Sequence, residues 1–238
     1  MEIKLWKKPK NPIIINGFPG FGLVGTISTE FLIDHLDMEL IGKVIVNENP
    51  AVVAIHEDKV VEPLGIFYNK KYNIVVIHAV SASNGLEWNL ADIIKKLAND
   101  LEAKEIISLE GVGSSATQPD TKRVFYFANN EKLKKALSNL DGMNPLKEGI
   151  IMGVTGALLL KVEGTPLSCI FAETHTDLPD SKAAARIIKV LDQYLGLKVN
   201  PGPLLDQATK FEEKIKGILK KGQEAQDISE EKRMSYVG

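Results

Sequence analysis

The sequence predicts an α/β fold: a three-layer sandwich of helices around a mostly parallel sheet, followed by a C-terminal helix and a flexible tail. Two observations support this fold class. Short apolar runs alternate with helical patterns over most of the first 200 residues of the 238-residue chain, as in other α/β proteins. Glycine-rich loops also follow predicted strands at Gly17, Gly111 and Gly153. Because clefts form beyond the carboxyl ends of parallel strands, we expect these three loops to surround a cleft.

The first predicted unit is a strand, a glycine-rich loop and a helix. The apolar run 13–15 precedes the loop 17–25, and residues 26–36 place apolar side chains at helical spacing. The loop contains the Gly-x-Gly-x-x-Gly spacing of dinucleotide-binding sites, although the candidate ribose ligand, Glu48, lies further along than usual. The loop is also bulky and apolar, which favours a structural corner or a contact between subunits. The residues of this second interpretation are Phe18, Pro19, Gly20, Phe21 and Gly22.

The remaining elements follow from the same patterns. Residues 40–80 contain short β-branched and aromatic runs and predict a meander of strands rather than further βαβ units. We then expect a helix over 86–101, a strand over 106–109 and a glycine loop over 110–115. A strand over 123–128, a helix over 130–140, a strand over 149–152 and a helix over 157–160 follow. The last strand is expected over 166–172, before a helix that Asp180 or Ser181 caps and that continues to Leu195.

The sequence Asn-Pro-Gly-Pro at 200–203 marks the best internal boundary. We expect a core domain over residues 1–200, an amphipathic helix over 201–222 and a flexible tail over 223–238. The helix carries a short heptad seam, which packs either on its own domain or against another chain. The seam residues are Leu204, Ala208, Phe211, Ile215 and Ile218. The polar tail ends in an aromatic and apolar peptide that suggests a docking segment, composed of Met234, Ser235, Tyr236, Val237 and Gly238.

Composition excludes several classes of partner. The net charge is -2, so no global basic field favours nucleic acid or an anionic membrane. No apolar run reaches the roughly 18 residues that a spanning helix needs. The N-terminus lacks the apolar segment of a signal peptide. Cys169 is the only cysteine and lies in an apolar run, which is typical of a reducing compartment. We therefore expect a cytoplasmic protein without nucleic-acid or membrane partners.

No catalytic set emerges from the sequence. The four histidines have no metal-ligand spacing, no nucleophile elbow or P-loop is present, and His78 fits a core position. We therefore predict no metal, no cofactor and no enzymatic activity. The alternative is a phosphorylase-like or nucleotide-binding enzyme. Its cleft would be formed by the loops at Gly20, Gly111 and Gly153, with Glu173 and His175 as its polar groups.

Several blocks together resemble the proteasome assembly chaperone family, in particular its archaeal homo-oligomeric members. These blocks are the loop 17–25 with the helix 26–36, the segment 153–160, Ala172 with Glu173, and residues 178–185. The resemblance implies an α/β fold reminiscent of nucleoside phosphorylases and no established enzymatic activity. It also implies binding to proteasome α subunits or the 20S core particle through a C-terminal hydrophobic-Tyr-any tripeptide.

The chain departs from that ending, because Tyr236 is third from the end and Ser235 precedes it. If the tyrosine keeps its pocket, the terminal carboxylate is displaced by up to roughly 3.5 Å. The resemblance thus implies a homo-oligomeric, ATP-independent assembly chaperone or proteasome-binding factor with an altered tail.

Overall fold

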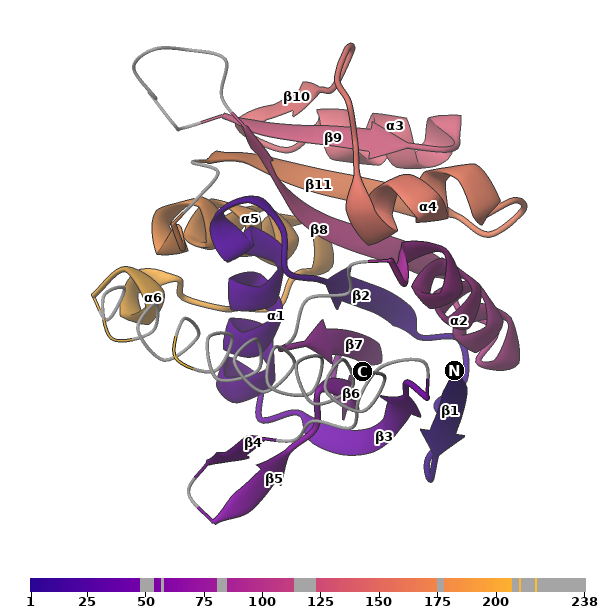
Figure 1. The fold of residues 1–238 in the computed structure, drawn as a ribbon. Helices are drawn as coiled ribbons and strands as arrows, with labels where there is room; N and C mark the ends of the chain where they lie inside the picture. The colour runs from indigo at the N-terminus through magenta and orange to yellow at the C-terminus, as the bar shows by residue number, and fades with distance from the viewer. Residues whose placement is uncertain are drawn as a thin grey trace, which may run out of the picture.

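The computed structural model describes residues 1–47, 54–56, 58–80, 85–113, 123–174, 178–206, 210 and 217. The predicted docking tail, most of the heptad seam, Glu48 and His175 lie outside these residues. The described elements form one nine-stranded sheet with helices on both faces, plus a two-stranded hairpin that projects from the body (Figure 1).

The main sheet has the strand order β1-β3-β6-β7-β2-β8-β11-β9-β10. Its strands are β1 (Glu2–Leu5), β2 (Ile13–Gly17), β3 (Glu39–Ile45), β6 (Leu64–Asn69), β7 (Ile74–Ala79), β8 (Glu105–Gly113), β9 (Val124–Ala128), β10 (Met143–Pro145) and β11 (Leu167–Thr174). The projecting hairpin pairs β4 (Ala54–His56) with β5 (Lys59–Val61).

The prediction of a mostly parallel sheet is wrong, because the sheet is mixed. The central strands β7, β2, β8 and β11 are parallel. On one side the predicted meander continues the sheet with antiparallel β6, β3 and β1. On the other side β9 runs antiparallel to β11, and the edge strand β10 is parallel to β9. A short turn joins β6 to β7 and reverses the direction of the chain, so the two strands are antiparallel. Parallel neighbours would need a longer crossover connection.

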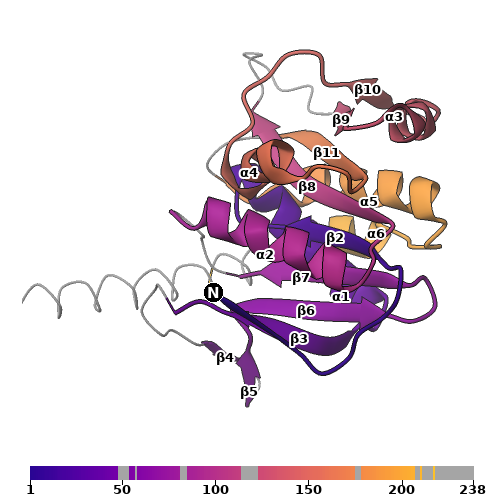
Figure 2. The ribbon, with the colours of Figure 1, turned by 90° about the vertical axis from the view of Figure 1, so that its right-hand side faces the viewer.

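Two helical layers cover the faces of the sheet, as the three-layer prediction requires. Helices α1 (Val24–His35) and α5 (Ser181–Leu195) share one apolar core, while α2 (Glu87–Asp100) and α4 (Gly153–Lys161) share the other. Figure 2 places α2 and α4 on the near side of the sheet and α5 on the far side. Neighbouring residues on β2 supply both cores, since Ile14 faces α2 and α4 whereas Ile15 faces α1 and α5.

Helix termini follow local sequence chemistry. The predicted cap of α5 is confirmed, because Asp180 Oδ1 accepts a hydrogen bond of 2.8 Å from the Ala183 backbone N–H. The helix ends at Gly196, which adopts a left-handed φ of 65°. Asn130 caps α3 (Glu131–Ser138) in the same way, by accepting from the Leu133 N–H.

Two local predictions are wrong. Glu110, Gly111 and Gly113 belong to β8 rather than to a loop, because β8 pairs with β11 as far as Gly113. Residues 149–152 form no strand. They cross the edge of the sheet as an irregular segment in which Ile150 exposes 88% of its surface. The apolar character of residues 149–152 therefore does not indicate a buried strand.

Glycines in residues 17–25, the glycine corner, allow backbone to approach backbone. A Cβ on Gly17 would lie 2.2 Å from the Gly25 carbonyl oxygen, and one on Gly25 would lie 2.5 Å from the Leu109 carbonyl oxygen. Gly22 also has a positive φ of 61°. The Asp180 N–H donates a hydrogen bond of 2.9 Å to the Gly22 carbonyl oxygen, which joins the corner to the start of α5. These contacts account for the glycines by packing within the chain.

Beyond the core, the structure describes α6 (Gly202–Asp206). Leu204 is 2% exposed and belongs to the core beneath α1 and α5. The first seam residue thus packs on its own domain, whereas Ala208, Phe211, Ile215 and Ile218 lie outside the described residues. Within the described part of the chain, no helix has the length and apolar character to cross a membrane.

We predict that Gly17→Ala lowers the free energy of unfolding by about 1–3 kcal/mol, because the new methyl group meets fixed backbone. Gly149→Ala is the matched control, since the nearest atom to its Cβ lies 3.6 Å away. That variant should stay within about 0.5 kcal/mol of the parent. Guanidinium unfolding of both variants tests the prediction, and equal stabilities would contradict it.

Candidate functional site

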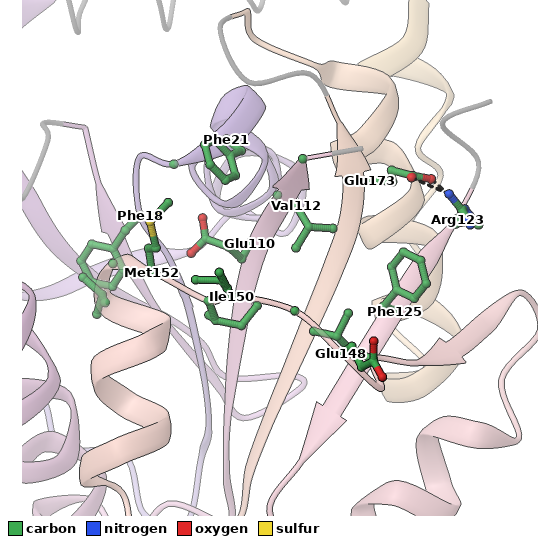
Figure 3. A pocket seen from close by; sticks show the side chains of 18 of the residues that line it. Phe18, Phe21, Glu110, Val112, Arg123, Phe125, Glu148, Ile150, Met152 and Glu173 are labelled. Carbon is green, nitrogen blue, oxygen red and sulfur yellow. Dashed lines mark hydrogen bonds and ion pairs between the residues drawn. The ribbon is translucent and has the colours of Figure 1, made fainter. Parts of the chain in front are cut away.

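A pocket of about 990 Å³ opens at the carboxyl ends of the central strands. The glycine corner, β8, β9, β11 and the segment 145–154 supply its walls (Figure 3). Its walls are mainly apolar and aromatic. Phe18, Phe21, Val112, Phe125, Ile150 and Met152 are among the side chains that line it. The predicted cleft is confirmed in this respect, because Gly20, Gly111 and Gly153 all border one cavity.

The carboxyl group of Glu110 points into this pocket from β8, between Phe18 and Phe21 (Figure 3). Its Oε1 atom lies directly against Gly20, where an added Cβ would be only 2.1 Å from it. Burial raises the pKa of Glu110 from 4.5 to about 7, although hydrogen bonds with Thr155 and the Gly111 backbone act in the opposite direction. The residue keeps some accessible surface, so its carboxyl group is desolvated while remaining reachable from the pocket.

A buried polar chain runs from Glu110 into the centre of the protein. Glu110 Oε2 lies 2.9 Å from Thr155 Oγ1, and Thr155 Oγ1 lies 2.9 Å from Ser108 Oγ. Ser108 Oγ donates a hydrogen bond of 2.9 Å to Asn16 Oδ1. Asn16 Nδ2 donates one of 3.4 Å to the Ile107 carbonyl oxygen. Asn16, Ser108 and Thr155 are at most 1% exposed. The chain therefore joins β2, β8 and the start of α4 beneath the pocket.

An ion pair borders the opposite side of the pocket. The Arg123 guanidinium donates from Nε to Glu173 Oε2 at 2.9 Å and from Nη2 to Glu173 Oε1 at 2.7 Å. Glu173 is 4% exposed, whereas the Arg123 side chain is 57% exposed. The Glu173 backbone carbonyl also accepts from Arg186 at 2.8 Å. Glu173 is one of the two polar groups of the enzymatic alternative, but this bidentate pairing engages both of its oxygens.

The other predicted residues fall in the core. Phe18 is 4% exposed and packs in the core beneath α2 and α4. His78 is buried, as expected, with Nδ1 2.8 Å from Thr29 Oγ1 and Nε2 2.9 Å from Glu30 Oε2. Cys169 is fully buried, and burial raises the pKa of its thiol. Among the residues that the structure describes, no cluster of three His, Cys, Asp or Glu side chains has the arrangement of a metal site.

Sequence reasoning missed the central side chain of the pocket. Glu110 was assigned to a loop, and no role was assigned to Thr155 or Arg123. The available signal was an acidic residue at the end of an otherwise apolar run, since 106–109 is followed at once by Glu110. A carboxyl group in that position sits at the carboxyl edge of a central strand, where α/β proteins place their binding sites.

The fold and the pocket define a three-layer α/β protein with a cavity at the carboxyl edge of its central parallel strands. Comparison with known proteins identifies the group more closely. Residues 14–219 match the model of the PAC2 family, and the chain belongs to this family.

Solved structures support the assignment. The chain is 34% identical to PbaA of Pyrococcus furiosus, which is described as an archaeal homologue of proteasome-assembly chaperone. That match covers 94% of this chain and 99% of the other, with a TM-score of 0.83. PbaB of the same organism, described as an archaeal proteasome activator, shares the fold at 21% identity and a TM-score of 0.74, over 91% of this chain and 98% of the other.

A sequence relative extends the comparison to another archaeon. The uncharacterised protein MJ0106 of Methanocaldococcus jannaschii is 28% identical over 96% of this chain and 94% of its own length. The descriptions of PbaA and PbaB concern proteasome assembly and activation. They give no support to the phosphorylase-like alternative.

We predict that Glu110→Gln removes part of the pH dependence of stability. The folded state raises the pKa of Glu110 to about 7. The stability that this proton contributes is therefore fully present below the unfolded pKa and is lost as the pH rises through about 7. At pH 8 the variant should be more stable than the parent, by on the order of 3 kcal/mol, or roughly 6–12 °C in Tm. Thermal unfolding between pH 5 and pH 8 measures the difference.

The exposed Glu131 offers a control, since Glu131→Gln changes the same group on the surface of α3. That variant should keep the parent's pH profile. A Glu110→Gln profile that runs parallel to the parent's across this range would contradict the assignment of a raised pKa.

Proposed function

We propose that this protein is an ATP-independent proteasome assembly chaperone or proteasome-binding factor that acts in the cytoplasm. Its partners would be proteasome α subunits or the 20S core particle. The observation that carries the proposal is the 34% identity with PbaA over 94% of the chain, because PbaA is described as a homologue of proteasome-assembly chaperone. The PAC2 match over residues 14–219 supports it independently of any single structure.

The C-terminal tail is the proposed docking segment. Residues 223–233 are strongly polar, and the following peptide combines Met234, Tyr236 and Val237. A tyrosine ring supplies a large apolar contact area at low entropic cost, and its hydroxyl tolerates a polar pocket rim. A terminal carboxylate adds a charge that a basic residue of the partner can bind.

Homo-oligomerisation would strengthen such a tail. Several tails on one assembly engage a ring of subunits with an avidity that exceeds the affinity of each tail. The glycine corner is a proposed contact between subunits, in which Gly20 is exposed while Pro19 and Phe21 are partly buried. Phe18 does not take part, because it lies within its own core.

We predict that deletion of Met234–Gly238 abolishes co-purification with proteasome α subunits or 20S core particles while the number of subunits in the oligomer is unchanged. The physical reason is the loss of the aromatic ring and of the terminal carboxylate's position. A chain that carries five Gly and Ser residues in place of this peptide keeps the tail length and tests the side chains alone. Pull-downs combined with native mass spectrometry provide the measurement.

Tyr236→Ala should weaken binding nearly as much as the deletion, whereas Ser235→Ala should leave binding near the parent's level. Undiminished binding by the deletion variant would exclude the tail mechanism. Binding by no form of the chain, including the parent, would exclude the proposed partner.

A further inference from the structure

The carboxyl-edge pocket has no role in the tail mechanism, yet it is a formed cavity with a polar group at its floor. Its volume of about 990 Å³ exceeds what a single side chain occupies, and it lies in the range of small-molecule sites. Ile150 and Met152 expose 88% and 60% of their surfaces at its mouth. Aromatic and aliphatic walls with a few polar groups, one of them a desolvated carboxyl group, are typical of a site that orients an organic ligand.

The direction of the hydrogen bonds in the polar chain beneath the pocket depends on the charge of Glu110. This chain contains three contacts of 2.9 Å, namely Glu110 with Thr155, Thr155 with Ser108, and Ser108 with Asn16. Asn16 offers its carbonyl oxygen to this chain, because its amide nitrogen donates to the Ile107 carbonyl. Each hydroxyl supplies one proton, so Ser108 and Thr155 provide two protons for three hydrogen bonds.

A protonated Glu110 supplies the missing proton. With Glu110 ionised, Thr155 donates to the carboxylate and Ser108 donates to Asn16, which leaves two hydroxyl oxygens in contact without a proton between them. With Glu110 neutral, each group donates to the next, and all three contacts are hydrogen bonds. Burial of the carboxyl group favours the same neutral form, through the raised pKa. Glu110 Oε1 then remains as an acceptor beside Gly20, in the wall of the pocket.

The charges around the cavity are close to balance when Glu110 is neutral. Arg123, just before β9, pairs with Glu173 from β11. Lys147 and Glu148 lie together on the segment before α4, and Glu87 lies at the start of α2. Cys169, which lies on β11 near Glu110, has a buried thiol group. Three residues of the glycine corner face Glu110, and none of them bears a charge: Phe18, Gly20 and Phe21.

We propose that this pocket binds an uncharged small molecule with an apolar body of ring size and an N–H or O–H group that donates to Glu110 Oε1. A cationic ligand is disfavoured because it requires the ionised carboxylate, which breaks the proton order of the chain. An anionic ligand places a second acceptor against Oε1. The pocket therefore selects ligands by their charge and hydrogen-bond donors as well as by their shape.

Three probes that share one phenyl ring separate these cases: benzamide is neutral, benzamidine is cationic and benzoate is anionic. Binding is followed on the full chain by NMR with ¹³C-methyl methionine, since Met152 lies at the pocket and Met38 lies in the distant core beneath α1. Benzamide should shift the Met152 signal saturably and leave Met38 unchanged. At pH 6 it should bind at least tenfold more tightly than either charged probe.

The pH dependence is the second readout. If only the neutral form binds and the pKa is about 7, the affinity for benzamide falls about tenfold between pH 6 and pH 8. Glu110→Gln mimics the neutral acid, so it should bind benzamide at both pH values with nearly the parent's pH 6 affinity. Glu148→Gln changes an exposed carboxylate of the same pocket and should keep the parent's tenfold fall.

Other outcomes overturn the proposal. Tighter binding of benzamidine than benzamide, or an affinity for benzamide that rises with pH, would show a cation site with an ionised Glu110. Absence of a saturable Met152 shift with benzamide, in the parent and in Glu110→Gln, would show that the cavity is not a site of this class. None of these results depends on whether the tail binds the proteasome.

Discussion

The close approach of the glycine corner to β8 and β11 is the constraint on which the rest of the structure depends. A Cβ on Gly111 would lie 2.1 Å from the Phe21 carbonyl oxygen, and one on Gly22 would lie 2.2 Å from Thr174 Oγ1. Only a residue without a Cβ fits at either of these positions. This contact sets the position of α1 on one face of the sheet and places Gly20 against Glu110. The cavity wall and the enclosed carboxyl group are therefore consequences of the same packing.

The corner also explains why a phosphate-loop pattern does not have to mean a phosphate site. Gly20, Gly22 and Gly25 match the spacing of a dinucleotide loop, yet each of them meets an atom of this chain where a Cβ would stand. Asp180 strengthens the same junction, because Oδ2 accepts from Thr174 at 2.9 Å while its N–H bonds the Gly22 carbonyl. The glycines thus allow close contacts between secondary-structure elements of the same chain. The polar group of the pocket, Glu110, comes from β8.

Local patterns predicted those features that local interactions determine. The β2–α1 unit, the Asp180 cap of α5 and the meander between β3 and β7 follow from periodicity, capping chemistry and turn residues. Strand direction on the far side of the sheet was not predictable in this way, because β9 pairs with β11 across a separation that no local signal reports. The role of Glu110 required the same long-range knowledge, since Thr155 and Gly20 reach it from separate elements.

The two edges of the nine-stranded sheet have a consequence for crowding. β1 offers four residues and β10 offers three, and β10 ends at Pro145, which has no N–H to donate. Such edges are poor templates for strand addition by a neighbouring chain. The brevity of the outermost strands therefore disfavours fusion of the nine-stranded sheets of neighbouring copies, even at high local concentration.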